Sequence, residues 1–370
     1  MRRRLNLRRS VKRLLLFTNI GAVLALFIST FSYLIDPNTI LWPAFLGLSF
    51  LPILLVNTLF IMFWLFAKPK LGFIGLITIA LCWSGVRKHM VLWPSPSEHL
   101  TSDVSIMTFN VRLFDLYNWG GNKETRNDIF RYLDEKNPDI LCFQEFFNTN
   151  DPAYFNTLDT MLQFLSSENV HDQYTAVLHY GKSKFGIATL SRFPILYRGH
   201  VPLDTAANNV AIFTDLEVNG DTIRVFNIHL ASVYISGIEN DLSKHIETND
   251  QDGQIRDIEL MTKKLSGGFK RRAKQSQVIR RYMDASPHPV IVCGDLNDTP
   301  GSYAYAHLSE GLVDAFVTKG FGGGSTYIGL FPGLRIDFML VDPSLSLSSF
   351  STERVALSDH RPLITTLSAE

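Results

Sequence analysis

The sequence has little cysteine and no net charge. Only 3 cysteines occur in 370 residues, and 35 Lys and Arg residues balance 35 Asp and Glu residues. Cys82, Cys142 and Cys293 lie singly within apolar runs and lack the spacing of metal ligands. We therefore expect small buried side chains at these positions, and a cysteine-based metal centre is excluded.

The balanced charge hides two unlike parts of the chain. Residues 1–100 contain 11 Lys and Arg residues and 2 acids, which leaves 24 basic and 33 acidic residues downstream. A protein that binds many phosphates along a nucleic-acid backbone usually presents a basic surface. The acidic balance argues against such a surface over the whole downstream region.

Charged residues are absent from three long stretches near the N-terminus. After an arginine-rich start, the uncharged runs cover residues 14–35, 40–67 and 71–86. A bilayer takes about 20 apolar residues to cross, so we expect three transmembrane helices in a membrane anchor at residues 1–100. A cleaved signal peptide is the alternative for the first run, but its apolar core is too long and two more runs follow.

The charges beside these runs predict an orientation in the membrane. The arginine-rich start, together with Lys68 and Lys70, places the N-terminus in the cytoplasm by the positive-inside rule. Three spans of a multi-pass cell (inner) membrane protein then place residues 101–370 on the periplasmic or extracellular side. If the third run is only interfacial, or if Arg87 and Lys88 stay inside, the downstream domain lies in the cytoplasm instead.

Downstream of the anchor, short apolar runs end in polar residues. Residues 104–109 end in Asn110, and residues 140–143 end in Gln144 and Glu145, with a helical pattern between them. This order indicates a strand–helix–strand unit, and active sites commonly form at the ends of such strands. A lone glutamate after a strand is more often a solvated or capping residue.

Five further apolar segments between residues 173 and 228, mostly separated by turn residues, indicate antiparallel strands. The last of them delivers Asn227 and His229 to the same face. A strand-end histidine by itself is more often structural than catalytic.

A later strand at residues 289–293 breaks into a Gly-Asp-Leu-Asn turn. Asp295 and Asn297 stand two residues apart and therefore point the same way. A carboxylate beside a carboxamide suits a site that takes up a proton and holds an oxygen atom.

The last two polar positions lie near the C-terminus. A strand at residues 335–341 buries Asp337, and a buried carboxylate needs a partner. His360 follows in a Ser-Asp-His sequence just before the final strand. It would pair with that aspartate and become oriented or charged.

The order of these motifs resembles the endonuclease/exonuclease/phosphatase superfamily, which includes DNase I-like nucleases, inositol polyphosphate 5-phosphatases and neutral sphingomyelinases. The resemblance covers about residues 103–367 and is carried by Asn110, Gln144-Glu145, Asn227-x-His229, Gly294-Asp295-x-Asn297, Asp337 and Ser358-Asp359-His360. It implies an α/β fold for a catalytic domain at residues 101–370, a four-layer sandwich of two mixed β-sheets flanked by helices and preceded here by about three transmembrane helices.

The resemblance also implies a cofactor and its ligands. Glu145 would be the main ligand of Mg²⁺, with Asn110 and Asp359 near the metal or a metal-bound water. A small set of hard oxygen ligands fits magnesium, which keeps several waters. Mn²⁺ is the alternative ion.

Catalytic roles follow from the same resemblance. Asp295 would draw a proton from the attacking water, and Asn297 would position that water or a phosphate oxygen. His229, together with His360 oriented by Asp337, would bind the phosphoryl oxygens and stabilise the charge that builds up during in-line displacement. No phosphoenzyme intermediate is expected.

The function implied is a membrane-anchored, Mg²⁺-dependent phosphoesterase that hydrolyses a phosphate mono- or diester by direct attack of an activated water. The acidic domain and its anchor favour a small or lipid-linked phosphorylated substrate, with membrane lipids as partners of the anchor. A membrane-anchored endo- or exonuclease acting on nucleic acid is the first alternative. A catalytically inactive binding domain is the second, although every expected site position is filled.

Residues 231–275 carry no catalytic signature and are interpreted as an insertion. Its C-terminal part, taken as residues 263–281, contains 8 Lys and Arg residues and no acid. Either it is a solvated helix face, or it is a patch near the membrane, including Arg271 and Arg272, that touches anionic lipid or a phosphorylated substrate. The glycine-rich residues 320–324 are expected to form a mobile loop over the site.

Overall fold

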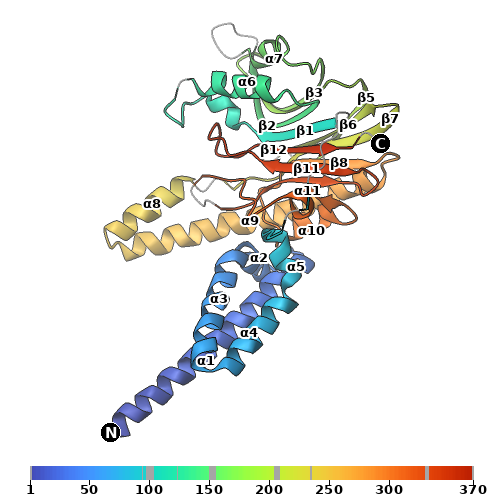
Figure 1. Ribbon diagram of the computed structural model, residues 1–370. Coiled ribbons are helices and arrows are strands. Elements are labelled where there is room, and N and C mark those ends of the chain that lie inside the picture. Colours follow the sequence, from blue (N-terminus) through green and yellow to red (C-terminus); the bar gives the residue numbers. More distant parts are fainter. Residues whose placement is uncertain are drawn as a thin grey trace.

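The chain folds into a helical N-terminal bundle and an α/β body, which lie end to end (Figure 1). The computed structural model describes residues 2–93, 95–96, 104–122, 124–149, 156–203, 209–233, 236–329 and 333–368. The N-terminus lies at the end of the bundle that is far from the body (Figure 1).

The helices of the bundle alternate in direction between its far end and the end next to the body. Its elements are α1 (Arg2–Phe31), η1 (Ser32–Leu34), α2 (Trp42–Leu48), α3 (Phe50–Ala67), α4 (Pro69–Leu81) and α5 (Trp83–His89). Helix α1 leads toward the body, α3 leads away from it, and α4 and α5 return (Figure 1). Lys68 follows the end of α3 and so lies toward the far end, and Lys12 of α1 lies close to it.

Two of these segments, Ser10–Leu34 and Phe50–Ala67, are long and apolar enough to cross a membrane. The predicted span at residues 40–67 is therefore too long, because α2 and α3 are separate helices that meet at Ser49. The predicted span at residues 71–86 is not one straight helix, because α4 and α5 meet at Cys82 with a bend of 63°. Helices in the bundle thus offer two spans, or three if the bent pair counts as one.

The body contains two mixed sheets of six strands each. The first has the order β11-β12-β1-β2-β4-β3 and consists of β1 (Val104–Asn110), β2 (Ile140–Thr149), β3 (Asn169–Leu178), β4 (Ser183–Ser191), β11 (Leu347–Thr352) and β12 (Leu363–Leu367). The second has the order β5-β6-β7-β8-β10-β9 and consists of β5 (Ile195–Val201), β6 (Val210–Val218), β7 (Asp221–His229), β8 (Val290–Asp295), β9 (Val313–Asp314) and β10 (Asp337–Val341). Each sheet has one parallel pair, β1–β2 or β7–β8.

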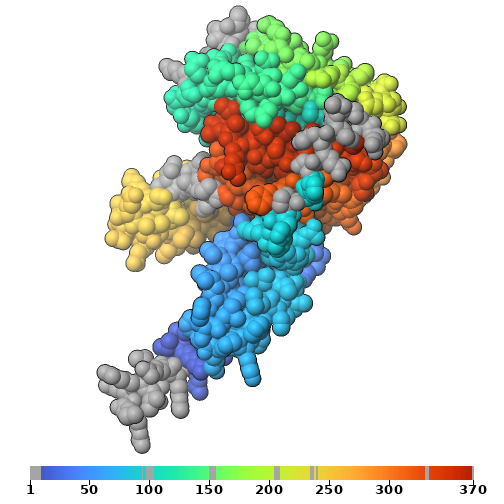
Figure 2. All heavy atoms as spheres, viewed as in Figure 1, coloured from blue at the N-terminus to red at the C-terminus, as the bar shows by residue number. Residues whose placement is uncertain are grey.

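The segment interpreted as an insertion is a helical hairpin. It consists of α8 (Ser236–Glu247) and the N-terminal half of α9 (Gln251–Asp284). Figure 2 shows this hairpin, in yellow, standing out from the body beside the blue N-terminal bundle. The C-terminal half of α9 packs on the body, where Ile279 and Met283 are buried.

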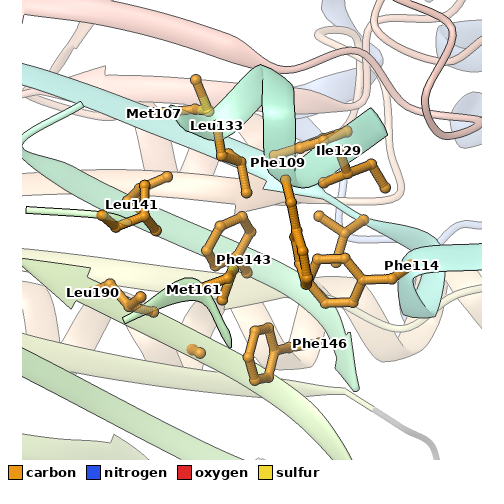
Figure 3. Packing of buried hydrophobic residues seen from close by; sticks show 14 of the residues in the cluster. Met107, Phe109, Phe114, Ile129, Leu133, Leu141, Phe143, Phe146, Met161 and Leu190 are labelled. Atoms are coloured by element: carbon orange, nitrogen blue, oxygen red, sulfur yellow. The ribbon is translucent and has the colours of Figure 1, made fainter. Parts of the chain in front are cut away.

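Apolar side chains fill the spaces between four layers, as predicted. The two sheets face each other across a core that includes Ile106, Val225 and Met339. On the outer face of the first sheet lie α6 (Thr125–Lys136) and α7 (Thr157–Met161), and Figure 3 shows Ile129 and Leu133 of α6 over this sheet. On the outer face of the second lie α9 and α10 (Tyr303–Ser309). The four-layer sandwich is confirmed.

The bundle is packed firmly against the body. The Ser32 hydroxyl donates to the carbonyl of Gly301 at 2.8 Å, and the Phe45 ring meets Phe269 of α9 edge to face at 5.2 Å. Arg335 donates to the carbonyl of Lys88 at 2.7 Å. These contacts come from η1, α2 and α5, so three parts of the bundle hold the same side of the body.

Candidate active site

The site forms where the parallel strand pairs of the two sheets end. Asn110 ends β1, His229 ends β7 and Asp295 ends β8. In the second sheet Asp295 is in register with His229 on one side and with Asp337 of β10 on the other. Carboxyl ends of parallel strands meet at the same edge of a sheet, so residues far apart in sequence become neighbours.

Asp295 lies at the centre of this group and is 1% exposed. Its carboxylate accepts hydrogen bonds from the Asn110 amide at 3.0 Å and from the Asn297 backbone N–H at 2.7 Å. The Nε2 atoms of His229 and His360 lie 3.7 Å and 3.8 Å away. Burial raises the pKa of the Asp295 carboxyl, against the opposing pull of His360. A raised pKa makes the carboxylate a stronger base.

Asp337 and His360 form a buried ion pair beside Asp295. The Nδ1 atom of His360 lies 2.9 Å from a carboxylate oxygen of Asp337. Burial alone would lower the pKa of His360, but Asp337 and then Asp295 outweigh it and raise that pKa to about 10. The ring is therefore a cation at neutral pH, with Nε2 directed at Asp295. The predicted pairing of Asp337 with His360 is confirmed.

Thr326 supports this pair and has no sequence motif of its own. Its hydroxyl oxygen accepts from the backbone N–H groups of Ile336 and Asp337, and the residue is fully buried. The neighbouring Tyr327 forms a β-bridge with His360. Thr326 therefore fixes the start of β10 at the point where Asp337 enters the site.

Glu145 reaches the site from inside β2 rather than from its end. The strand continues to Thr149, and a β-bulge between Phe143 and Phe146 breaks its pairing with β4. Glu145 itself adopts a left-handed backbone with φ of 48°. Bulges and left-handed residues commonly occur where a side chain must be turned toward a functional site.

The Glu145 carboxylate and the His229 ring are near neighbours without a direct hydrogen bond. His229 Nε2 lies 3.9 Å from a Glu145 oxygen, too far for a hydrogen bond. This buried nitrogen has no hydrogen-bond partner among the described residues. A buried polar atom without a partner is costly, so the arrangement suits a group that arrives from outside the chain.

Asp359 joins the site through Asn110 and through an arginine that sequence reasoning missed. The hydroxyl of the preceding Ser358 donates to the backbone carbonyl of Asn110 at 2.8 Å. Asp359 pairs with Arg112 Nε at 3.3 Å, and the Arg112 guanidinium lies 4.7 Å over the ring of Trp119. The signal available in the sequence was its position, two residues after the strand-end Asn110.

Arg112 also begins an unusual turn, η2 (Arg112–Asp115). All four of its residues have left-handed backbones, with φ values between 44° and 57°. Such a conformation costs about 1 kcal/mol or more per non-glycine residue, and strain of this kind clusters at functional sites. Phe114, within this turn, is buried against the rings of Phe130, Phe143 and Phe146 and so secures it.

Two motif residues, Gln144 and Asn227, serve to join the sheets. The Gln144 side-chain amide donates to the Asn227 side-chain oxygen at 2.7 Å, and Asn227 donates in turn to the carbonyl of Ala188 at 3.0 Å. Both residues are fully buried. They hold β2 and β7 at the separation that brings Glu145 toward His229.

Two groups in the site have the donors to hold a metal ion. Asn110, Glu145 and Asp359 offer only oxygen atoms, and the Glu145 and Asp359 side chains are 28% and 22% exposed, which leaves access for water. Asp295, Asp337 and His360 form a compact buried cluster whose ligand atoms lie within 4.8 Å of one another. Magnesium prefers oxygen ligands and keeps several waters, so the first group fits it better.

Two expectations about the surroundings of the site are wrong. Arg272 is not part of a surface patch, because it is 2% exposed and pairs with buried Asp298 at 2.9 Å. The glycine-rich residues 320–324 do not cover the site, because Gly322 forms a two-way backbone bridge with Val91 beside the bundle. In both cases the residue is held by a contact with a part of the chain that is distant in sequence.

Comparisons with known proteins cover both parts of the chain. A family model described as the Endonuclease/Exonuclease/phosphatase family matches residues 107–360. A second, described as Domain of unknown function (DUF8431), matches residues 12–89. No curated protein matches the chain.

Solved structures with the same fold include three of known source. The human Nocturnin catalytic domain with bound sulfate anion is 17% identical, with a TM-score of 0.53 over 76% of this chain and 98% of that one. The D. rerio TDP2 complexed with single strand DNA product is 17% identical, with a TM-score of 0.51 over 72% and 100%. An endonuclease/exonuclease/phosphatase from Bacteroides vulgatus is 18% identical, with a TM-score of 0.51 over 73% and 100%. At such identities the likeness concerns the fold.

Proposed function

This chain belongs to the endonuclease/exonuclease/phosphatase family, and from that membership we propose that it is a membrane-anchored, Mg²⁺-dependent phosphoesterase acting on a small or lipid-linked phosphate ester. The family comprises metal-dependent hydrolases of phosphoric ester bonds. The proposal adds the metal, the anchor and the class of substrate.

The observation that carries the proposal is the environment of Asp295. One buried carboxylate, with a raised pKa, lies within 4 Å of two histidines and accepts from two asparagines. Asp295 would take a proton from the attacking water, which Asn297 would help to position. Its carboxylate is already aligned by Asn110, so little reorganisation accompanies the proton transfer.

The two histidines would bind the phosphoryl group that is attacked. His360 is a cation held by Asp337, and His229 Nε2 has no partner among the described residues. Both Nε2 atoms lie within 4 Å of the Asp295 carboxylate, so oxygen atoms of a phosphate bound beside it would find donors there. Donors fixed in place before the reaction stabilise the charge that grows in the transition state. Direct attack by water requires no phosphoenzyme intermediate.

Glu145, Asn110 and Asp359 would hold the magnesium ion, with Mn²⁺ as a substitute. A bound divalent ion neutralises phosphate charge and lowers the pKa of a coordinated water. Arg112 pairs with Asp359 at 3.3 Å and would limit how far this carboxylate can turn. The inactive-domain alternative is disfavoured, because each expected position carries its functional side chain in a mutually supporting arrangement.

The bundle supports the anchoring part of the proposal. Its far end carries Lys12 and Lys68, while its near end holds the body. Positive charge is retained on the cytoplasmic side, so the path of α1, α3 and the bent α4–α5 pair would place the body outside. Substrates would then lie at or near the outer face of the bilayer.

The orientation can be tested with reporters fused to the C-terminus of the full chain. We expect an alkaline phosphatase reporter, active only outside the cytoplasm, to be active, and a cytoplasm-only fluorescent reporter to be dark. The reverse result would place the body in the cytoplasm and contradict three crossings. A reporter fused after Lys68, at the far end of the bundle, is the matched control and should give the opposite readings.

The substrate class is tested with the purified full chain in lipid nanodiscs. We expect hydrolysis with Mg²⁺ of at least one compound from a panel of isoprenoid phosphates, inositol phosphates and phospholipids. Chelation by EDTA should abolish this activity, and added Mg²⁺ or Mn²⁺ should restore it. Activity that persists in excess EDTA would contradict the metal-dependent mechanism.

A membrane-anchored nuclease is the second candidate. Its support is the TDP2 structure of the same fold, which was complexed with single strand DNA product, and the basic stretch at residues 263–281. Cleavage of DNA in the same assay, with activity that falls steeply as salt is added, would favour it. Inertness on DNA would remove it.

A further inference from the structure

The α8–α9 hairpin has an apolar stripe that points to the bundle side of the molecule. Residues three or four apart share one face of a helix, and this face of α9 carries Ile255, Ile258, Thr262, Leu265 and Phe269. Phe269, at the body end of the stripe, is 2% exposed and packs on Phe45 of the bundle. Ile255 and Ile258, at the free end, are 57% and 52% exposed. The face that touches the bundle thus continues beyond it with nothing from the described chain to cover it.

The root of the hairpin lies level with the end of the first candidate span. That span ends at Leu34. Just beyond it, the Asn38 amide donates to the Lys270 carbonyl of α9 at 3.2 Å, and Gln277 of α9 donates to Asp36 at 3.2 Å. Helix α9 therefore crosses the bundle where its membrane-spanning part would give way to water, and it extends sideways from there (Figure 1).

The hairpin is built to hold this position. His245 of α8 lies 2.6 Å from the Asp257 carboxylate of α9. Gly253 permits close approach, since a Cβ there would fall 2.7 Å from the His245 ring. Asp250 caps α9 by accepting from the Gly253 backbone N–H at 3.0 Å. These contacts fix the two helices relative to each other, so the exposed isoleucines lie on an ordered surface.

Basic side chains border the stripe. Lys263 and Lys270 are exposed on the adjacent flank of α9. Exposed Glu259, four residues before Lys263, lies on the same flank. The opposite face carries exposed Leu260 and Arg271. An apolar stripe with a basic border is typical of helices that lie in the plane of a membrane surface, where anionic lipid attracts the bases.

We propose that the α8–α9 hairpin lies on the bilayer, with Ile255 and Ile258 inserted among the lipid headgroups and Lys263 and Lys270 on anionic lipid. This inference rests on the proposed membrane anchoring but not on the phosphoesterase activity. The bilayer is the occupant that the packing specifies, because the stripe is continuous with the bundle contact at Phe269. A second copy of the chain or a phosphorylated soluble molecule would be a different occupant, and the test separates them.

The test places a fluorophore at single cysteines in the full chain, reconstituted at one copy per nanodisc. Ile258→Cys reports the stripe, and Leu260→Cys, two residues away on the opposite face, is its matched control. Leu59→Cys, read with lipid brominated deep in its acyl chains because Leu59 lies midway along α3, reports insertion of this helix, and Leu59 is 57% exposed. The native cysteines are all buried, which restricts labelling to the new sites.

In nanodiscs of phosphatidylcholine and phosphatidylglycerol, we expect shallow brominated lipid to quench the probe at 258 at least about threefold more than at 260, because interfacial helices bury one face by about 5–10 Å. Lys263→Glu should lower that ratio toward its value in pure phosphatidylcholine. Arg131→Glu on α6, equal in charge change but 68% exposed on the far side of the body, should leave it unchanged.

Equal quenching at 258 and 260, with a quenched probe at 59, would overturn the hairpin inference while leaving the anchor intact. An unquenched probe at 59 would instead contradict the anchoring. In a second preparation with several copies per nanodisc, shielding of 258 that is absent at one copy would identify a second chain as the occupant and would also overturn the proposal. Hydrolysis, measured separately, bears only on the proposed function.

Discussion

Replacing Asp295 with asparagine is expected to lower kcat by about 10³-fold, because a positioned general base typically contributes about 10²–10⁴-fold. Asparagine keeps the size of the side chain but cannot accept a proton from water. It also leaves His229 and His360 without the carboxylate that lies 3.7 Å and 3.8 Å from them. We expect KM to change much less, since the phosphate-binding groups remain.

The measurement is the initial rate at saturating Mg²⁺, with the thermal midpoint recorded in parallel. Because burial disfavours the charge of Asp295, its removal should not lower stability greatly. Asp342→Asn, at the other end of β10, is the control and should retain nearly full activity. If the Asp295 variant kept more than about a tenth of kcat, the assignment of the base would be wrong.

Replacing Glu145 with glutamine is expected to raise the Mg²⁺ concentration for half-maximal activity by about 100-fold or more. The variant removes one negative charge at the ion, and a unit charge at about 4 Å contributes about 4 kcal/mol at an effective dielectric constant of about 20. Each 1.4 kcal/mol corresponds to about tenfold in affinity. The measurement is a Mg²⁺ titration of the hydrolysis rate. Glutamine should preserve the bulge in β2, because the bulge is formed by the backbone at position 145 and not by its side chain.

Two further variants make this second prediction decisive. Glu168→Gln, an exposed position just before β3, should leave the Mg²⁺ titration unchanged. Asp337→Asn should lower kcat by uncharging His360, with little change in the Mg²⁺ requirement. If Asp337→Asn shifted the Mg²⁺ titration and Glu145→Gln did not, the ion would bind the buried Asp295, Asp337 and His360 cluster instead.

The sequence predicts those residues of the site that lie at the ends of strands. Asn110, His229 and Asp295 each follow an apolar run, and their convergence follows from the parallel pairing of β1–β2 and β7–β8. The Asp337–His360 pairing was predictable because a buried carboxylate needs a partner.

What the sequence did not predict depends on irregular backbone and on distant contacts. The bulge that turns Glu145 inward is a property of the pairing between β2 and β4, and no local pattern encodes it. The left-handed turn at Arg112 is strained, and propensities describe unstrained chains. Arg272 lies in a basic stretch whose sequence predicts a solvated helix face. It is buried because it pairs with Asp298, which is distant in sequence.

The firm packing between bundle and body has a consequence for producing this protein without a membrane. A chain cut near residue 100 would strip Phe45 from Phe269, remove the Lys88 carbonyl from buried Arg335, and take Ser32 away from the Gly301 carbonyl. The cut would expose an apolar surface and remove one acceptor from the Arg335 guanidinium, which would keep its ion pair with Asp314 at 2.8 Å. Exposed apolar surface and a lost buried hydrogen bond both favour aggregation or local unfolding. The linker thus separates the two parts along the sequence, but their side chains pack together as one structure. An enzyme released from the bilayer should be prepared with its helices attached, in detergent or lipid, rather than as a soluble fragment.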